Sequence, residues 1–220
     1  MVPTSKKDAP TRREELLKQA LEPLLDACIQ NAESMMVTVW GCNVLLETVL
    51  EANQRADSVA NAEKFRALPQ RTIADLVARS LSSGDEADGD AAAAPMDVDG
   101  TSESGAATGR KSLVEDPYAQ GMISKLLKRL SPDGSGFAAL LYEALINADE
   151  GLEKTVSSDR GAFLLHSLLL AADSDVRTAL TEQLQPHRES ITDNAGLGYK
   201  KLLAALDGPD AAAAGADEDD

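Results

Sequence analysis

Four segments of the chain begin with a small residue and then place mostly apolar residues about three, four, seven and eight positions later. They are GCNVLLETVL at 41–50, AQGMISKLLK at 119–128, GAFLLHSLLL at 161–170 and GYKKLLAALD at 198–207. This spacing puts the apolar side chains on one face of an α-helix. Similar helical segments that recur along a chain are typical of repeat proteins, whose units stack on their neighbours to bury a continuous core.

The intervals between the four segments indicate the size of the repeat. Their first residues are about 78, 42 and 37 residues apart, and removing a low-complexity insert of roughly 35 residues from the first interval leaves about 43. A period near 40 belongs to stacked two- or three-helix repeats. A further segment, GFAALLYEAL at 136–145, fits the same pattern, and we interpret it as the preceding helix within the third unit.

The apolar pattern of residues 16–28 also predicts a helix and not a strand. Its apolar residues follow the spacing of one buried helical face, and they are Leu16, Leu17, Ala20, Leu21, Leu24, Leu25 and Cys28. No alternation with a period of two persists anywhere in the sequence. We therefore predict an all-α fold, with an α-solenoid favoured over an irregular helical bundle.

Two acidic segments lack this periodicity. Residues 81–109 contain seven acidic and no basic residues, and 207–220 contain six acidic residues, which leaves only about −3 of the net charge of −16 on the rest. Their Ala, Gly, Ser and Asp composition offers little apolar surface to offset the entropy of ordering. The expected organisation is a flexible basic lead at 1–10, a helical repeat domain at 11–206 interrupted by a disordered acidic insert at 83–110, and a disordered acidic tail at 207–220. The insert is either a solvated spacer or an acidic element that restrains a basic neighbour.

Several classes of function find no support in the sequence. No apolar run approaches the roughly 20 residues that span a membrane. Cys28 and Cys42 are too few for a disulfide framework and are expected to be buried thiols. His166 and His187 are the only histidines, and no nucleophile motif or phosphate-binding loop is present. We expect no enzymatic activity, metal, cofactor or membrane association.

The order of the landmarks resembles the carboxy-terminal region of the Puf-A/Penguin family of Pumilio-like proteins. These landmarks are SKKD at 5–8, RREELL at 12–17, a helix containing WGC, the acidic insert, DRGAFLLHSLL and GYKKLLAAL. The segment that opens with Asp159 and Gly161 also looks like the second helix of a Pumilio-type repeat. Gly161 is expected to lie where the repeat turn enters this helix and leaves no room for a side chain.

This resemblance implies a right-handed solenoid of degenerate Pumilio-type repeats, located in the nucleus and nucleolus. It implies binding of RNA (pre-rRNA or mRNA) without base specificity, in ribosome biogenesis of the large subunit and pre-rRNA processing, with a further role in translational regulation of mRNA. We expect a monomer that forms the carboxy-terminal part of a longer solenoid. Pre-ribosomal proteins are expected as further binding partners. The alternative is a protein-interaction scaffold of the same fold, which binds a ribosomal protein or assembly factor.

A Pumilio-type repeat reads one base with two or three side chains on adjacent turns of its second helix. The matching positions are Cys42, Asn43 and Leu46; Gln120, Gly121 and Ser124; Ala162, Phe163 and His166; and Tyr199, Lys200 and Leu203. Leu46 and Leu203 cannot hydrogen-bond a base edge, and Gly121 cannot stack on a base. Only Phe163 with His166 retains a stacking platform, and packing in a leucine-rich core is the commoner role of such residues.

Contact with RNA phosphates requires less precise geometry than base reading, because Lys and Arg need only lie along a surface. The candidate RNA-binding residues are Lys6, Lys7, Arg12, Arg13, Gln120, Ser124, Lys125, Lys128, Arg129, Arg160, Phe163, His166, Lys200 and Lys201. Each basic cluster can also be an ordinary solvated helix face. Basic side chains on one continuous face would favour RNA, whereas an exposed apolar groove would favour a protein partner.

Overall fold

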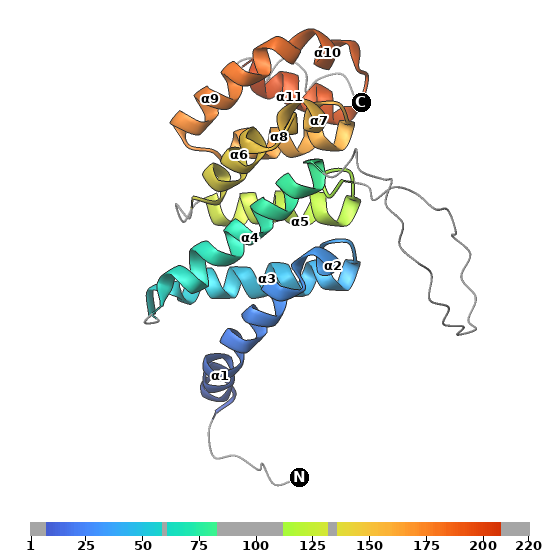
Figure 1. The fold of residues 1–220 in the computed structure, drawn as a ribbon. Helices are drawn as coiled ribbons and strands as arrows, with labels where there is room; N and C mark the ends of the chain where they lie inside the picture. Colours follow the sequence, from blue (N-terminus) through green and yellow to red (C-terminus); the bar gives the residue numbers. More distant parts are fainter. Residues whose placement is uncertain (1–7, 59–60, 83–111, 132–135, 208–220) are drawn as a thin grey trace, which may run out of the picture.

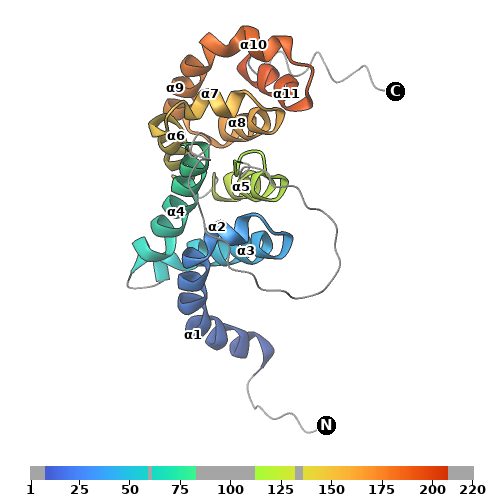
Figure 2. The ribbon, with the colours of Figure 1, turned by 45° about the vertical axis from the view of Figure 1, so that its right-hand side comes forward.

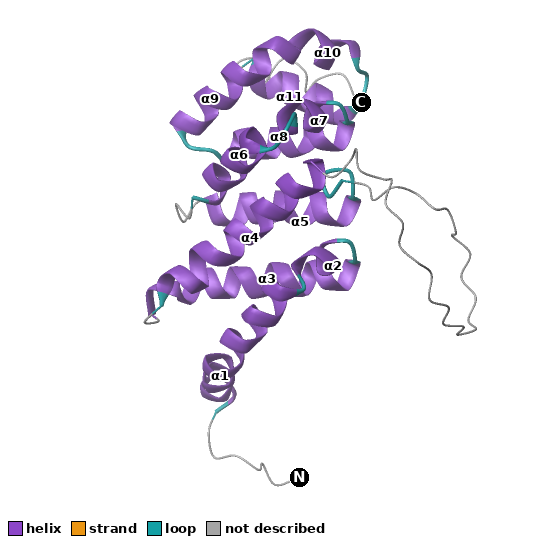
Figure 3. Ribbon diagram, viewed as in Figure 1, coloured by secondary structure: helices purple, strands orange, loops and turns teal. Residues whose placement is uncertain are grey.

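The computed structural model describes residues 8–58, 61–82, 112–131 and 136–207, and within these ranges it contains helices and no strand (Figure 3). The predicted all-α fold is therefore confirmed. The helices are α1 (Ala9–Gln30), α2 (Ala32–Met36), α3 (Val39–Arg55), α4 (Ala62–Ser82), α5 (Pro117–Leu130), α6 (Phe137–Asn147), α7 (Gly151–Val156), α8 (Asp159–Ala171), α9 (Ser174–Leu184), α10 (Arg188–Asp193) and α11 (Leu197–Leu206). Short 3-10 turns lie at Ala56–Ser58 and Gln185–His187.

The helices stack in two layers (Figures 1 and 2). Helices α3, α5, α8 and α11 form the repeat layer, in which each helix packs on the next. Helices α4, α6 and α9 form the backing layer and also contact one another in sequence order. This arrangement is an α-solenoid, as the recurring pattern predicted.

The four recurring segments are the four helices of the repeat layer. Their small first residues, at 41, 119, 161 and 198, lie one or two positions inside α3, α5, α8 and α11. The segment at 136–145 forms α6 of the backing layer, which agrees with its interpretation as a preceding helix. The apolar pattern therefore identified the repeat layer and one helix of the backing layer, α6.

Side-chain caps fix where the repeat-layer helices begin. The Thr38 hydroxyl accepts a hydrogen bond from the Gly41 N–H at 3.2 Å, and the Ser158 hydroxyl accepts one from the Gly161 N–H at 3.1 Å. Such caps satisfy backbone donors that have no partner within the helix. Helix α11 takes its cap from the neighbouring repeat, because the Asp159 carboxylate of α8 accepts from the Gly198 N–H at 2.8 Å.

The close approach at Gly161 leaves no space for a side chain, as the sequence predicted. A Cβ built there would lie 1.8 Å from the carbonyl oxygen of Thr155, in the preceding short helix α7. Gly41 repeats this arrangement, with the carbonyl oxygen of Met35 only 2.4 Å from the built Cβ. The small residue at these positions therefore lets the chain turn from one helix directly into the next.

One continuous core joins the two layers. Leu126, Leu141, Leu165 and Leu202 are fully buried within it. A smaller cluster lies where α1 packs on α3 and α4, around Leu21, Leu25, Ala52, Ala56 and Phe65. Cys28 and Cys42 are buried free thiols, as expected.

The predicted buried face of α1 is wrong at Leu16, Ala20 and Leu24. Leu21, Leu25 and Cys28 are buried, but the side chains of Leu16 and Leu24 are 66% and 45% exposed. Ala20 is also exposed, and Leu17 is half-buried. Pro23 lies inside α1 and removes a backbone donor, which explains the bend of this helix in Figure 2. The first half of α1 contacts α3 through Glu14 and Arg55, but the described chain does not cover Leu16 and Ala20.

The expected acidic insert at 83–110 lies outside the described residues, as do residues 1–7 of the expected lead and 208–220 of the expected tail. Helix α1 begins at Ala9, so the last two residues of the expected lead are helical. Asp207 directly follows α11 and is exposed.

Candidate nucleic-acid interface

Helices α3, α5 and α8 pack against the backing layer and against their neighbours, and α11 packs on α8 and α10. The side of these helices away from these contacts is open. We term this open side of α5, α8 and α11 the repeat-layer face. It is formed by Gln120, Ser124, Lys125, Lys128, Phe163, His166, Ser167, Lys200 and Lys201. The four lysines are exposed, and the other five residues are half-buried. The structure thus brings together candidate residues from three separate parts of the sequence.

The charge of these three helices differs from that of α6 and α9, the backing helices that pack behind them. Helices α5, α8 and α11 carry one acidic residue, Asp159, and six basic residues, which are Lys125, Lys128, Arg129, Arg160, Lys200 and Lys201. The adjacent backing helices α6 and α9 together carry three acidic residues and one basic residue. A surface of one sign concentrates counter-ions of the other sign. Helix α4, the third backing helix, carries four basic and two acidic residues, so the contrast is with α6 and α9. In this part of the stack, α5, α8 and α11 form the side that attracts polyanions.

The basic character ends at α3. This helix carries Glu47 and Glu51 against the single base Arg55. The Arg55 guanidinium is already engaged, because it binds Glu51 and also forms a two-pronged ion pair with Glu14 of α1. The hydrogen bond from Arg55 holds the pKa of the Glu14 carboxyl below its usual value. This cluster ties α1 to α3 and offers no free cation to a ligand.

Phe163 and His166 form the aromatic centre of the face. Their ring centroids lie 5.8 Å apart with an edge-on geometry, and the Lys201 ammonium lies 4.8 Å from the Phe163 centroid. A cation over an aromatic ring is attracted by the negative charge of its face. Lys201 thus covers part of the platform on which a base would stack.

His166 is held in its neutral form. Burial lowers the pKa of its imidazole below the usual value, and the positive charge of Lys201 lowers it further. Its Nδ1 atom is buried without a hydrogen-bond partner. At neutral pH this histidine therefore adds no positive charge to the face.

A short chain of polar side chains links α5 and α8. The Gln120 amide donates to the Ser124 hydroxyl, and the Ser167 hydroxyl also donates to Ser124, both at 3.2 Å. Gln120 and Ser124 are thus partly satisfied within the protein. Sequence reasoning missed Ser167, because the three base-reading positions carried over from the Pumilio repeat end at His166.

The remaining candidates lie elsewhere or serve other contacts. Arg160 donates to the backbone carbonyl of Glu115 at 3.2 Å. Arg12 and Arg13 lie on the first half of α1, beside Leu16 in a pocket of about 410 Å³, and Figure 1 shows this part of α1 apart from α5, α8 and α11. Lys6 and Lys7 lie outside the described residues. The candidates therefore do not form one cluster.

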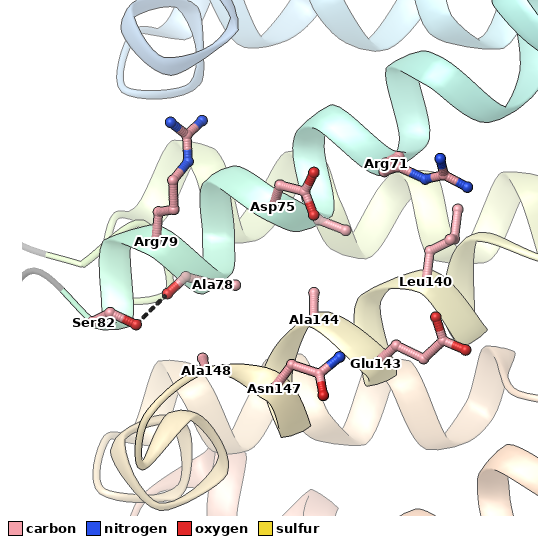
Figure 4. A pocket seen from close by; sticks show the side chains of 11 residues that line it. Arg71, Asp75, Ala78, Arg79, Ser82, Leu140, Glu143, Ala144, Asn147 and Ala148 are labelled. Atoms are coloured by element: carbon pink, nitrogen blue, oxygen red, sulfur yellow. Dashed lines mark hydrogen bonds between the residues drawn. The ribbon is translucent and has the colours of Figure 1, made fainter.

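A second pocket, of about 520 Å³, lies between α4 and α6 in the backing layer (Figure 4). Arg71, Asp75 and Glu143 line it, together with small residues such as Ala144. Its mixed charges favour neither an anion nor a cation. No group of acidic, His or Cys side chains in the described part of the chain is arranged to hold a metal ion, and none of the helices described there is long and apolar enough to cross a membrane.

Two exposed aromatic residues were not among the sequence candidates. The side chain of Trp40 is 81% exposed, and that of Tyr118 is 46% exposed. They occupy the same repeat position, one residue before the small residues at 41 and 119. This shared position was the signal that could have identified them.

Comparisons with known proteins relate this fold to others. The profile of the CPL (NUC119) domain family matches residues 1–131. A crystal structure of human Puf-A superposes on 91% of this chain with a TM-score of 0.63 and 21% sequence identity. The chain spans about one third of the length of that structure, with 33% covered. No curated protein matches the sequence.

Proposed function

The chain belongs to the CPL (NUC119) domain family, and on this basis we propose that it binds RNA through backbone phosphates on its repeat-layer face. The observation that carries the proposal is the excess of six basic residues over one acidic residue on α5, α8 and α11. Four of these, Lys125, Lys128, Lys200 and Lys201, are exposed on the same face. Ammonium groups spaced along one surface are what phosphate contact requires.

The base-reading positions support binding without base preference. Leu46 is buried, Gly121 has no side chain, and Leu203 is half-buried. The side chains of Gln120 and Ser124 are hydrogen-bonded to each other. A repeat that reads a base needs two or three free side chains on adjacent turns, and these positions do not supply them.

The resemblance to the Puf-A/Penguin proteins supports the biological setting of this proposal. The RNA would be pre-rRNA during assembly of the large ribosomal subunit in the nucleolus, and mRNA in a translational role.

A binding assay with unrelated sequences tests this proposal. Labelled single-stranded RNAs of equal length and different sequence are titrated with the chain near 50 mM salt. We expect their affinities to agree within about threefold, since phosphates are common to all of them. Phe163→Ala should lower the affinity for all of them alike if a base stacks on this ring. A preference of 100-fold for one sequence, or no binding to any of them, would contradict the proposal.

One observation favours the second candidate function, a protein-interaction scaffold. The first half of α1 exposes Leu16 beside Arg12 and Arg13 in an open apolar pocket. Exposed apolar patches of this kind commonly mark protein contacts. A ribosomal protein or assembly factor bound there would leave the repeat-layer face free, so the two functions involve different ends of the molecule.

A further inference from the structure

One edge of the repeat layer carries a row of large exposed side chains. The residue before each small first residue is Trp40 on α3, Tyr118 on α5, Arg160 on α8 and Leu197 on α11. All four are exposed, and Trp40 is 81% exposed. Because the small residue packs inward, the preceding residue lies about 100° around the helix and faces the open edge.

Contacts between the helices show that the first three members of the row belong to adjacent helices of the stack. Arg160 donates to the carbonyl of Glu115, three residues before Tyr118, so its guanidinium reaches the start of α5. Helices α3 and α5 pack on one another, and Figure 1 shows that both begin on the same side of the stack. The first turn of α5 therefore adjoins the first turn of α3, which carries Trp40.

The side chains of Trp, Tyr and Arg each present a flat surface on which an RNA base can stack. A tryptophan exposed to this extent is unusual, because tryptophan is highly buried on average. Lys125 and Lys128 lie further along α5, about two and three turns beyond Tyr118. Stacking surfaces at the edge and cations along the face are the two parts that proteins use to hold single-stranded nucleic acid.

We propose that Trp40, Tyr118 and Arg160 form a stacking edge for the unpaired bases of single-stranded RNA, whose phosphates lie on the lysines of the repeat-layer face. The inference rests on the proposed RNA binding and adds which form of RNA is bound and where its bases lie. It places them on a row separate from the base-reading positions Asn43, Gly121, Phe163 and Lys200. A duplex keeps its bases paired inside the helix and cannot offer them to this edge.

The single tryptophan of the chain makes this proposal directly measurable. Unlabelled oligouridylate is titrated into the intact chain near 50 mM salt while the fluorescence of Trp40 is followed. Binding is measured separately by anisotropy with the same RNA carrying a label. We expect the Trp40 fluorescence to be quenched in parallel with binding, whereas an RNA duplex of equal length should bind without quenching.

The affinities of substituted chains for the same single-stranded RNA test the stacking edge independently of fluorescence. Trp40→Ala and Tyr118→Ala should each weaken single-strand binding roughly 5- to 150-fold, the range found for loss of one stacked base. Trp40→Phe should retain most of the affinity. Leu197→Ala changes the same repeat position where no flat side chain is present, so it should have little effect. Melting temperatures of all variants check that the exposed positions do not affect folding.

The outcomes separate this inference from the proposed function. If anisotropy shows binding but the Trp40 fluorescence and the affinity of Trp40→Ala are unchanged, the stacking edge is overturned and phosphate binding remains. If no RNA binds, both proposals fail. If Trp40 is buried by a purified ribosomal protein while Trp40→Ala leaves RNA affinity unchanged, the edge is a protein-binding surface and the inference is wrong. Val39 and Val44, which lie near Trp40 in the sequence, are also exposed, and exposed apolar side chains of this kind are typical of a protein-binding surface.

Discussion

Gly161→Ala is expected to destabilise the fold by about 3 kcal/mol, the effect of forcing extra atoms into a packed interior. A Cβ at this position would lie 1.8 Å from the carbonyl oxygen of Thr155 and 2.8 Å from the carbonyl carbon. Both atoms belong to the backbone of α7, so a side-chain rotation cannot relieve the contact. The free energy of unfolding from urea titration measures the effect.

Gly121→Ala is the matched control for this substitution. Gly121 also lies inside a repeat-layer helix, but nothing lies within 4 Å of a Cβ built there. Alanine is the better helix former by about 1 kcal/mol, so this variant should be slightly more stable than the parent chain. Changes of the same sign in the two variants would contradict the close-packed turn at Gly161.

Removal of two lysines from α5 should cause a large loss of RNA affinity. Each phosphate neutralised on a single strand contributes on the order of 10-fold near 50 mM salt. Lys125→Ala/Lys128→Ala should therefore weaken binding roughly 100-fold, as measured by anisotropy of labelled RNA. Both side chains are exposed, so the melting temperature should hardly change.

The control for this variant removes the same charge from the backing layer. Arg66→Ala/Arg71→Ala takes two positive charges from α4, where Arg66 forms only an exposed ion pair with Asp57. Exposed pairs contribute little to stability, and long-range effects of two distant charges are screened by salt. Its RNA affinity should fall less than about threefold. Equal losses in the two variants would show that net charge, and not the repeat-layer face, determines binding.

The stacking order of the solenoid was predictable because it depends on local patterns. A small residue followed by leucines at helical spacing identified α3, α5, α8 and α11, and the same pattern identified α6. Gly161 was informative for the same reason, since glycine early in a helix is costly unless a close contact requires it. These features depend on residues that are near one another in the sequence.

Other features depend on contacts between distant residues. The cap that Asp159 gives to Gly198 spans 39 residues, and the position of Lys201 over Phe163 requires α8 and α11 to be packed. Neither can be read from the pattern of one helix. The exposure of Leu16 shows the same limit, because periodicity defines which face of α1 is apolar but does not tell whether another element covers it.

The sequence identified many of the residues of the candidate site but not their arrangement in space. The lysines of α5 and α11 were recognised as separate clusters, and the fold places both in one layer. Trp40 and Tyr118 were missed because the carried-over positions lie after the small residue and not before it. The sequence signal that could have identified both is their shared position, one residue before the small residue.

The affinity of the intact chain for a single-stranded RNA across a salt series tests the central claim most directly. If Lys125, Lys128, Lys200 and Lys201 each neutralise one phosphate, the logarithm of the association constant should fall with the logarithm of salt concentration at a slope of about −3. This slope should become less steep by about 1.4 in Lys125→Ala/Lys128→Ala. A slope near zero, or no detectable binding at 50 mM salt, would contradict binding of RNA by the repeat-layer face.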